Sequence, residues 1–318
     1  MRFFILACVC MAVIGSSAQE KATDAQERLK SVRVATRSSL QTNKTVTVWY
    51  RVPEGFDPAQ RDRLWRVLVV FGGKNVSGKR EVDGGAGLEW GKWADEQGVF
   101  LVSPGFVDDN YWNPQSWSGR ALFDALALIK KQYPVCDTKL LYYGHSAGSQ
   151  CANLFAAWRP DAVRAWVSHG CGVFYKPSVS MKGVPGLVTC GEADTARCIT
   201  SRRFVQQCLR QGQDIIWRSY PNSPHNVPKE SLKLARAVLT HYHTTHLSDL
   251  QPTRLAAGSG ARRTETPSPA LFVGDDADHT YYPAGSAKAD AISPVDRVAL
   301  PTEDIAKAWG EEGERNSD

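Results

Sequence analysis

Short apolar segments alternate with amphipathic ones along most of this chain, and this alternation constrains its fold more than any other feature. Apolar runs of strand length include residues 65–71 (WRVLVVF), 139–143 (KLLYY) and 186–190 (GLVTC), whereas residues 118–132 carry apolar side chains at helical spacing. Other strands are predicted over 45–52, 99–102, 163–168 and 215–220, and other helices over 88–97, 149–158, 201–211 and 229–241. Strands joined by helices of this length favour an α/β fold, with a mostly parallel sheet covered by helices on both faces.

The first residues have the pattern of an export signal. Arg2 precedes an apolar stretch from Phe3 to Ile14, and the small residues 15–18 follow it. The apolar stretch is shorter than the roughly 20 residues that a membrane-spanning helix needs. We therefore expect a signal peptide over 1–18 and a secreted or periplasmic mature protein with no membrane span. A retained N-terminal anchor is the alternative.

The rest of the chain divides by composition. We expect a lead-in helix or loose arm over 19–44, a main α/β domain over 45–246, a linker over 247–269 that is rich in Ser, Thr, Pro and Gly, and an acidic extension over 270–318. Within the extension, residues 270–273 have the pattern of a strand and residues 301–309 that of a short helix. This extension either docks on the main body or is disordered.

Charge is distributed unevenly along the chain. The net charge is +5, but the residues from Asp249 onward include 13 acidic and 7 basic ones, so the preceding part carries about +11. A solvated basic surface is one interpretation, and an affinity for anionic partners such as acidic polysaccharide is another. No basic run is interleaved with aromatic residues, which argues against a nucleic-acid partner.

Six cysteines remain once Cys8 and Cys10 leave with the signal peptide. They are Cys136, Cys151, Cys171, Cys190, Cys198 and Cys208. An even number in an oxidising compartment favours one or two disulfides, although six cysteines allow fifteen pairings. Cys151 and Cys190 lie in apolar segments and fit buried thiols equally well. No CxxC pair with matching histidines is present, so the sequence predicts no zinc site.

The segment Gly144-His145-Ser146-Ala147-Gly148 matches the pattern G-x-S-x-G between a predicted strand and a predicted helix. In that setting the serine occupies a strained turn whose neighbours must be small, and its Oγ is lifted clear of the sheet. The sequence therefore predicts Ser146 as a nucleophile and the backbone N–H of Ala147 as one donor to an oxyanion. The turn at Gly72-Gly73-Lys74 supplies the second donor, Lys74 first and Gly73 as the alternative.

A serine hydroxyl needs a neighbouring base, and His225 lies in a loop after the last predicted strand. Asp194 follows another predicted strand and is the expected partner of the imidazole, with Glu192 as its rival. His169 ends a strand and is expected to line the site. The order Ser146, Asp194, His225 agrees with the nucleophile–acid–base order known for such an arrangement.

Four segments carry a resemblance to a known superfamily. The motifs VVFGGKN, YYGHSAGS, TCGEAD and NSPHNVP resemble those of α/β-hydrolases, most of all the extracellular esterases akin to polyhydroxybutyrate depolymerases and feruloyl esterases. The resemblance covers about residues 45–246 and implies an α/β-hydrolase fold that works without a cofactor. Those families often have a His-Gly pair where this chain has Gly72-Gly73. The acidic extension lies outside the resemblance.

Features that bear on the substrate are fewer. Only about 17 residues separate two predicted strands near residues 168 and 186, too few for a large lid domain. Tyr111, Trp112 and Trp117 follow another strand and are expected to contact substrate together with His145, although aromatic residues pack in cores equally often. The sequence thus predicts a serine carboxyl-ester hydrolase acting on small-molecule or polymer-linked esters. A serine peptidase and a non-catalytic binding protein of the same fold are the alternatives.

Overall fold

A computed structural model describes residues 27–36, 44–60, 63–83, 88–107, 110–251 and 269–314. The predicted signal peptide over 1–18 and most of the predicted linker lie outside the described residues. Of the helices that the structure does describe, none has both the length and the hydropathy that crossing a bilayer requires.

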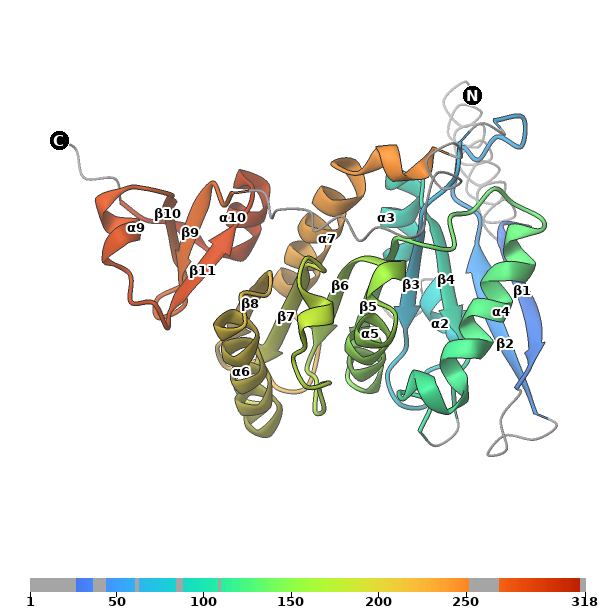
Figure 1. Cartoon of the computed structure of the whole chain (residues 1–318), viewed down its shortest axis with the longest axis horizontal. Helices are drawn as coiled ribbons and strands as arrows, with labels where there is room; N and C mark the ends of the chain where they lie inside the picture. The colour runs from blue at the N-terminus through green and yellow to red at the C-terminus, as the bar shows by residue number, and fades with distance from the viewer. Residues whose placement is uncertain are drawn as a thin grey trace, which may run out of the picture.

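One eight-stranded sheet forms the centre of the molecule, in the order β1-β2-β4-β3-β5-β6-β7-β8 (Figure 1). The strands are β1 (Leu29–Ala35), β2 (Thr45–Arg51), β3 (Val67–Phe71), β4 (Phe100–Pro104), β5 (Leu140–His145), β6 (Val163–His169), β7 (Gly186–Gly191) and β8 (Ile215–Tyr220). Strand β2 runs antiparallel to both of its neighbours, whereas β4, β3 and β5 to β8 are parallel. The carboxyl ends of β4, β3 and β5 to β8 therefore meet along one edge of the sheet.

Helices cover both faces of this sheet. They are α2 (Gly78–Val82), α3 (Trp90–Gln97), α4 (Gly119–Lys130), α5 (Ala147–Trp158), α6 (Thr195–Arg210) and α7 (Lys229–Thr244). Successive side chains of β3 enter two separate cores: Val69 packs with residues of α4, α5 and α6, and Leu68 packs with residues of α3 and α7. The predicted α/β architecture is confirmed. Residues 170–185, which connect β6 to β7, contain only the short helix η3 (Val179–Met181) and no lid domain.

The lead-in segment differs from expectation, because residues 29–35 form strand β1 and not a helix or loose arm. Val32 and Val34 are buried and face Val48 and Val46 of β2, while Arg33 between them is exposed. This alternation of buried and exposed residues is the period of a strand with one buried face. The alternation covers too few residues, within a polar segment, for the strand to be predicted from the sequence.

The C-terminal extension folds into a second sheet. Its strands are β9 (Phe272–Asp275), β10 (Thr280–Pro283), β11 (Arg297–Leu300) and β12 (Glu311–Glu312), in the order β11-β9-β10-β12. Two helices, α9 (Ala287–Ala291) and α10 (Glu303–Trp309), complete it. The predicted strand and helix therefore both exist, shifted by about two residues, and the alternative of disorder was wrong for residues 272–312.

This extension docks against β8, the last strand of the main sheet (Figure 1). Trp309 Nε1 donates to the carbonyl of Trp217 at 2.7 Å, and Trp217 Nε1 donates to Asp276 Oδ2 at 3.0 Å. Arg218 Nε donates to the carbonyl of Trp309 at 2.7 Å, while Ile305 and Trp309 belong to the same core as α7. The extension thus covers an edge strand that would otherwise face solvent.

All six cysteines beyond the predicted signal peptide are free thiols in the structure, so no bridge supports the predicted disulfides. Among the residues described, no group of three or more His, Cys, Asp or Glu side chains is arranged to hold a metal ion.

A buried ion cluster lies at the amino ends of the central strands β3, β5 and β6. Arg66 is fully buried, and its guanidinium donates to the carbonyls of Lys139 and His246. Asp249 Oδ2 lies 2.5 Å from Arg164 and 3.6 Å from Arg66. Residues 247–250 form the helix η4 and belong to the main body, although the sequence placed them in the linker.

Asp249→Asn is expected to lower the free energy of unfolding by about 3 kcal/mol, because it removes the negative charge that lies between two buried guanidinium groups. Asp161→Asn is the matched control, since Asp161 is 61% exposed and lies 3.5 Å from Arg159 on the surface. That variant should change the free energy by less than about 0.5 kcal/mol. Urea denaturation followed by tryptophan fluorescence measures both. Equal effects of the two substitutions would contradict a structural role for the cluster.

Candidate active site

Ser146 occupies a sharp turn between β5 and α5. Its backbone has φ 57° and ψ −122°, a conformation that residues with a side chain rarely adopt, and its N–H donates to the carbonyl of His169 at 3.0 Å. A Cβ on Gly144 would lie 2.0 Å from the carbonyl oxygen of Gly148, and one on Gly148 would lie 1.9 Å from that of Phe71. Both glycines are therefore required for the turn to fit between the strands.

Three loops at the carboxyl edge of the sheet bring Ser146, Asp194 and His225 together. His225 Nδ1 lies 2.6 Å from Asp194 Oδ2, and His225 Nε2 lies 2.8 Å from Ser146 Oγ. Because a carboxylate only accepts hydrogen bonds, Nδ1 carries the proton and Nε2 accepts from the serine hydroxyl. The imidazole is 34% exposed and the carboxylate 9%, so the serine end of this chain of hydrogen bonds is open to a substrate.

The two acidic candidates have different partners. Asp194 accepts from His225 and, through Oδ1, from Arg197 at 3.1 Å. Glu192 Oε1 accepts instead from the hydroxyl of Ser219 on β8 at 2.8 Å. The turn after β7 therefore directs one carboxylate toward the imidazole and the other toward the neighbouring strand.

His169 does not line the site, contrary to the expectation from sequence. Its ring is 1% exposed, and Nε2–H donates to the carbonyl of Asn226 at 2.7 Å. Nδ1 lies 2.6 Å from the hydroxyl oxygen of Thr189 and 2.8 Å from that of Ser231, and its single lone pair accepts from one of them. Burial lowers the pKa of His169 to about 4, so the ring is neutral and fastens the loop of His225 to the sheet. The one sequence feature that indicates this role is the position of His169 at the end of a predicted buried strand.

His145 lies beside the imidazole of His225, with ring centroids 5.0 Å apart. Burial, with repulsion from His169 and His225, lowers the pKa of His145 to about 3. Burial thus keeps the imidazoles of His145 and His169 neutral. The predicted contact of His145 with substrate stays a prediction.

The turn after β3 lies against the serine. A Cβ placed on Gly73 would be 3.8 Å from Ser146 Cβ and 3.7 Å from the carbonyl oxygen of His145. Ala147 is the first residue of α5, where helix geometry leaves the backbone N–H without an intrahelical partner. Lys74 follows Gly73 in an exposed turn. Its assignment as the second oxyanion donor, like that of Ala147 as the first, stays a prediction.

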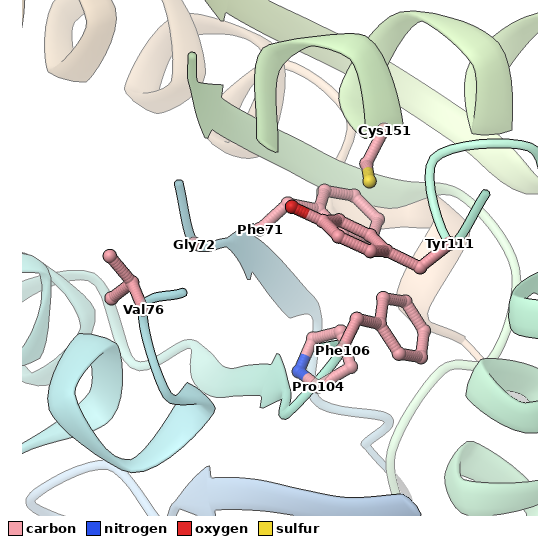
Figure 2. A pocket seen from close by; sticks show the side chains of 7 residues that line it. All are labelled: Phe71, Gly72, Val76, Pro104, Phe106, Tyr111 and Cys151. Atoms are coloured by element: carbon pink, nitrogen blue, oxygen red, sulfur yellow. The ribbon is translucent and has the colours of Figure 1, made fainter. Parts of the chain in front are cut away.

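The predicted aromatic contacts separate into two groups. Tyr111 lines a small apolar hollow, shown in Figure 2 and called here the Tyr111 hollow, and Trp112 beside it is partly exposed. Trp117 is only 4% exposed and packs edge-on against Phe106 at 5.3 Å, so it supports the wall of the hollow from behind. Neighbouring side chains cover the ring of Trp117, so it has almost no surface that a substrate could contact.

We compared the chain with protein families, curated proteins and solved structures. No family model matches the sequence, and no curated protein matches it. Among solved structures, the chain is similar to a thermostable esterase (TM-score 0.52, 14% identity, 71% of this chain and 64% of that chain). It is also similar to a Pyrobaculum calidifontis esterase, with a TM-score of 0.51, 13% identity, and coverage of 69% of this chain and 86% of that chain. For a ferulic acid esterase the TM-score is 0.50 and the identity 14%, with coverage of 70% of this chain and 96% of that chain.

The chain has the α/β-hydrolase fold. It spans less than two thirds of the length of the thermostable esterase, and at 13–14% identity these likenesses establish the fold alone. In the α/β-hydrolase fold a serine in a G-x-S-x-G turn projects from the top of the sheet, and an acid and a histidine follow it in the chain. Ser146, Asp194 and His225 occupy corresponding places after β5, β7 and β8.

Gly148→Ala is expected to lower the free energy of unfolding by about 3 kcal/mol or more, because the new methyl group would meet the backbone of β3. Gly172→Ala is the control, since its Cβ would only touch flexible side chains of Arg197 and Gln150 at 3.6 Å. Urea denaturation of both variants measures the difference. A Gly148→Ala protein as stable as the Gly172→Ala control would contradict the close packing of Gly148 against the backbone of Phe71.

Acid is expected to destabilise the protein through its buried histidines. An unfolded histidine titrates near pH 6.5, whereas the folded pKa is about 4 for His169 and about 3 for His145. Between these values the unfolded chain binds protons that the folded one does not. The free energy of unfolding therefore falls as pH falls below 6.5, by up to about 1.4 kcal/mol per pH unit for each histidine.

The variant His169→Gln isolates one of these contributions. Its urea midpoints between pH 6 and 4.5 should fall less steeply with acid than those of the unchanged protein, by up to about 1 kcal/mol per pH unit. Parallel curves for the two proteins would show that His169 titrates normally in the folded state.

Proposed function

We propose that this protein is an exported serine hydrolase that cleaves carboxylic esters, either small molecules or groups attached to a polymer. One observation carries the proposal: the continuous hydrogen-bonded chain Ser146–His225–Asp194 at the open edge of the sheet. Its distances of 2.8 and 2.6 Å are those that proton transfer between a nucleophile and its base requires.

The first half of the reaction forms an acyl-enzyme. Ser146 Oγ attacks the ester carbonyl carbon while its proton passes to His225 Nε2, and Asp194 stabilises the resulting imidazolium. The oxyanion of the tetrahedral intermediate accepts from the backbone N–H groups of Ala147 and Lys74. The carbon–oxygen bond to the alcohol then breaks, and the alcohol leaves with the proton from His225.

The second half releases the acid. A water molecule gives a proton to His225 Nε2 as its oxygen attacks the acyl carbon, and a second oxyanion forms at the same donors. Collapse of this intermediate breaks the bond to Ser146 Oγ, which recovers the proton. These steps require no metal ion or organic cofactor.

The names of structurally similar proteins and the short connection after β6 support ester substrates rather than peptides. The three solved structures named above are called esterases, and the described connection from β6 to β7 contains no lid domain. Export rests on the N-terminal sequence pattern, which the structure does not describe. Neither a nucleic-acid partner nor a membrane span is part of the proposal.

Ser146→Ala is expected to lower kcat for p-nitrophenyl acetate by about 10,000-fold or more, and Asp194→Asn by about 1,000- to 10,000-fold through loss of the correct imidazole tautomer. Glu192→Gln is the matched control, since its carboxylate contacts Ser219 and not His225, and it should retain activity within a few-fold. Initial rates and circular dichroism measure activity and folding for each variant.

A fluorophosphonate probe distinguishes the alternatives. It should label Ser146 of the unchanged protein and not the Ser146→Ala variant. Faster cleavage of peptide anilides than of p-nitrophenyl acetate would indicate a peptidase. Absence of both labelling and turnover would indicate a binding protein. A large loss of activity in Glu192→Gln, with little in Asp194→Asn, would overturn the assignment of the acid.

A further inference from the structure

We propose that the acyl side of this site accepts only short acyl groups, so that acetate esters are the favoured substrate class. The inference rests on the ester hydrolysis proposed above and concerns Phe106 and Tyr111, which fill the space where a longer acyl chain would extend. Tyr111 is one of the substrate contacts predicted from the sequence, whereas Phe106 is not among them.

The Tyr111 hollow lies at the end of β3, where the turn toward Ser146 begins. It is lined by residues whose side chains are mostly apolar, namely Phe71, Gly72, Val76, Pro104, Phe106, Tyr111 and Cys151 (Figure 2). Phe71 pairs with Gly144 in the sheet, two residues before Ser146, and Gly72 starts the turn that lies against the serine. Cys151 lies on α5 one turn beyond Ala147. The hollow therefore adjoins the expected position of the oxyanion.

The chemistry decides which part of the substrate faces this hollow. His225 must protonate the leaving alcohol, so the alcohol lies on the side of the serine that faces β7 and β8, where the loops of Asp194 and His225 are. The acyl substituent occupies a different direction around the tetrahedral carbon. The turn after β3 and the Tyr111 hollow lie on the other side of β5, toward β3 and β4, and receive it.

The hollow is closed by aromatic packing. Its side chains approach so closely that a water molecule does not fit between them. Phe106 and Tyr111 are each 4% exposed, with ring centroids 6.0 Å apart, and Phe106 also packs against Trp117 at 5.3 Å and Phe155 at 6.3 Å. An acyl chain that entered the hollow would therefore have to displace a ring held from behind by the core.

The hydroxyl of Tyr111 adds a second obstacle. It is buried without a hydrogen-bond partner, and Figure 2 shows it pointing toward the Gly72 end of the hollow. Burial raises the pKa of Tyr111, so the group remains a neutral donor. An alkyl chain inserted here has no acceptor to offer this donor, so displacing the ring gains no compensating hydrogen bond.

The test is a chain-length profile with a constant leaving group. We expect kcat/KM of the unchanged protein to be at least about tenfold higher for p-nitrophenyl acetate than for the butyrate, and lower still for the octanoate. Phe106→Ala should raise the butyrate-to-acetate ratio by about tenfold by removing the obstructing ring. Val107→Ala is the control, because Val107 is adjacent in sequence but 63% exposed, and it should leave the ratio unchanged.

The outcomes separate this inference from the proposed function. Fluorophosphonate labelling of Ser146 together with equal rates on acetate and butyrate would overturn the acyl-length limit and leave ester hydrolysis standing. Labelling with an acetate preference that Phe106→Ala leaves unchanged would also overturn the role of the ring. If Phe106→Ala does not fold, Phe106→Leu shortens the side chain more conservatively, and the profile of the unchanged protein still decides. Absence of labelling and hydrolysis would contradict both proposals.

Discussion

The contact between the first turn of α5 and the end of β3 is the constraint on which the site depends. It requires that neither Gly144 nor Gly148 carry a side chain, because a Cβ at either position would lie about 2 Å from backbone atoms. Only then can Ser146 adopt its positive φ and project above the sheet. The same close packing brings the turn at Gly73 against the serine. A single steric condition thus arranges a candidate nucleophile beside a candidate oxyanion site.

Parallel strand order does the rest of the assembly. Loops that follow β5, β7 and β8 all leave the sheet at one edge, so residues nearly 80 positions apart meet there. Buried hydrogen bonds then hold the result, since His169 links the carbonyl of Asn226 to hydroxyls on β7 and α7. Because burial keeps His169 and His145 neutral, neither opposes positive charge on His225 at neutral pH.

The C-terminal sheet stabilises the strand that precedes His225. Trp309 and Asp276 bond to Trp217, and the carbonyl of Trp309 accepts from Arg218, so the extension and the edge strand share one network. An uncovered β8 would expose unpaired backbone groups and frame the His225 loop less firmly. The extension is therefore part of the structural support of the site, although it contributes no side chain to the hydrogen-bonded chain of Ser146, His225 and Asp194.

The parallel α/β architecture, the turn at Ser146 and the order of the acid and the histidine could be predicted from the sequence, because periodicity and glycine placement are local properties of the chain. The tertiary structure was needed to distinguish Asp194 from Glu192, to show that His169 and Trp117 are buried, and to pair residues 29–35 with β2. Those outcomes depend on where a side chain points once distant segments meet. Two carboxylates two residues apart are equivalent in sequence, and the path of one turn directs them to different partners.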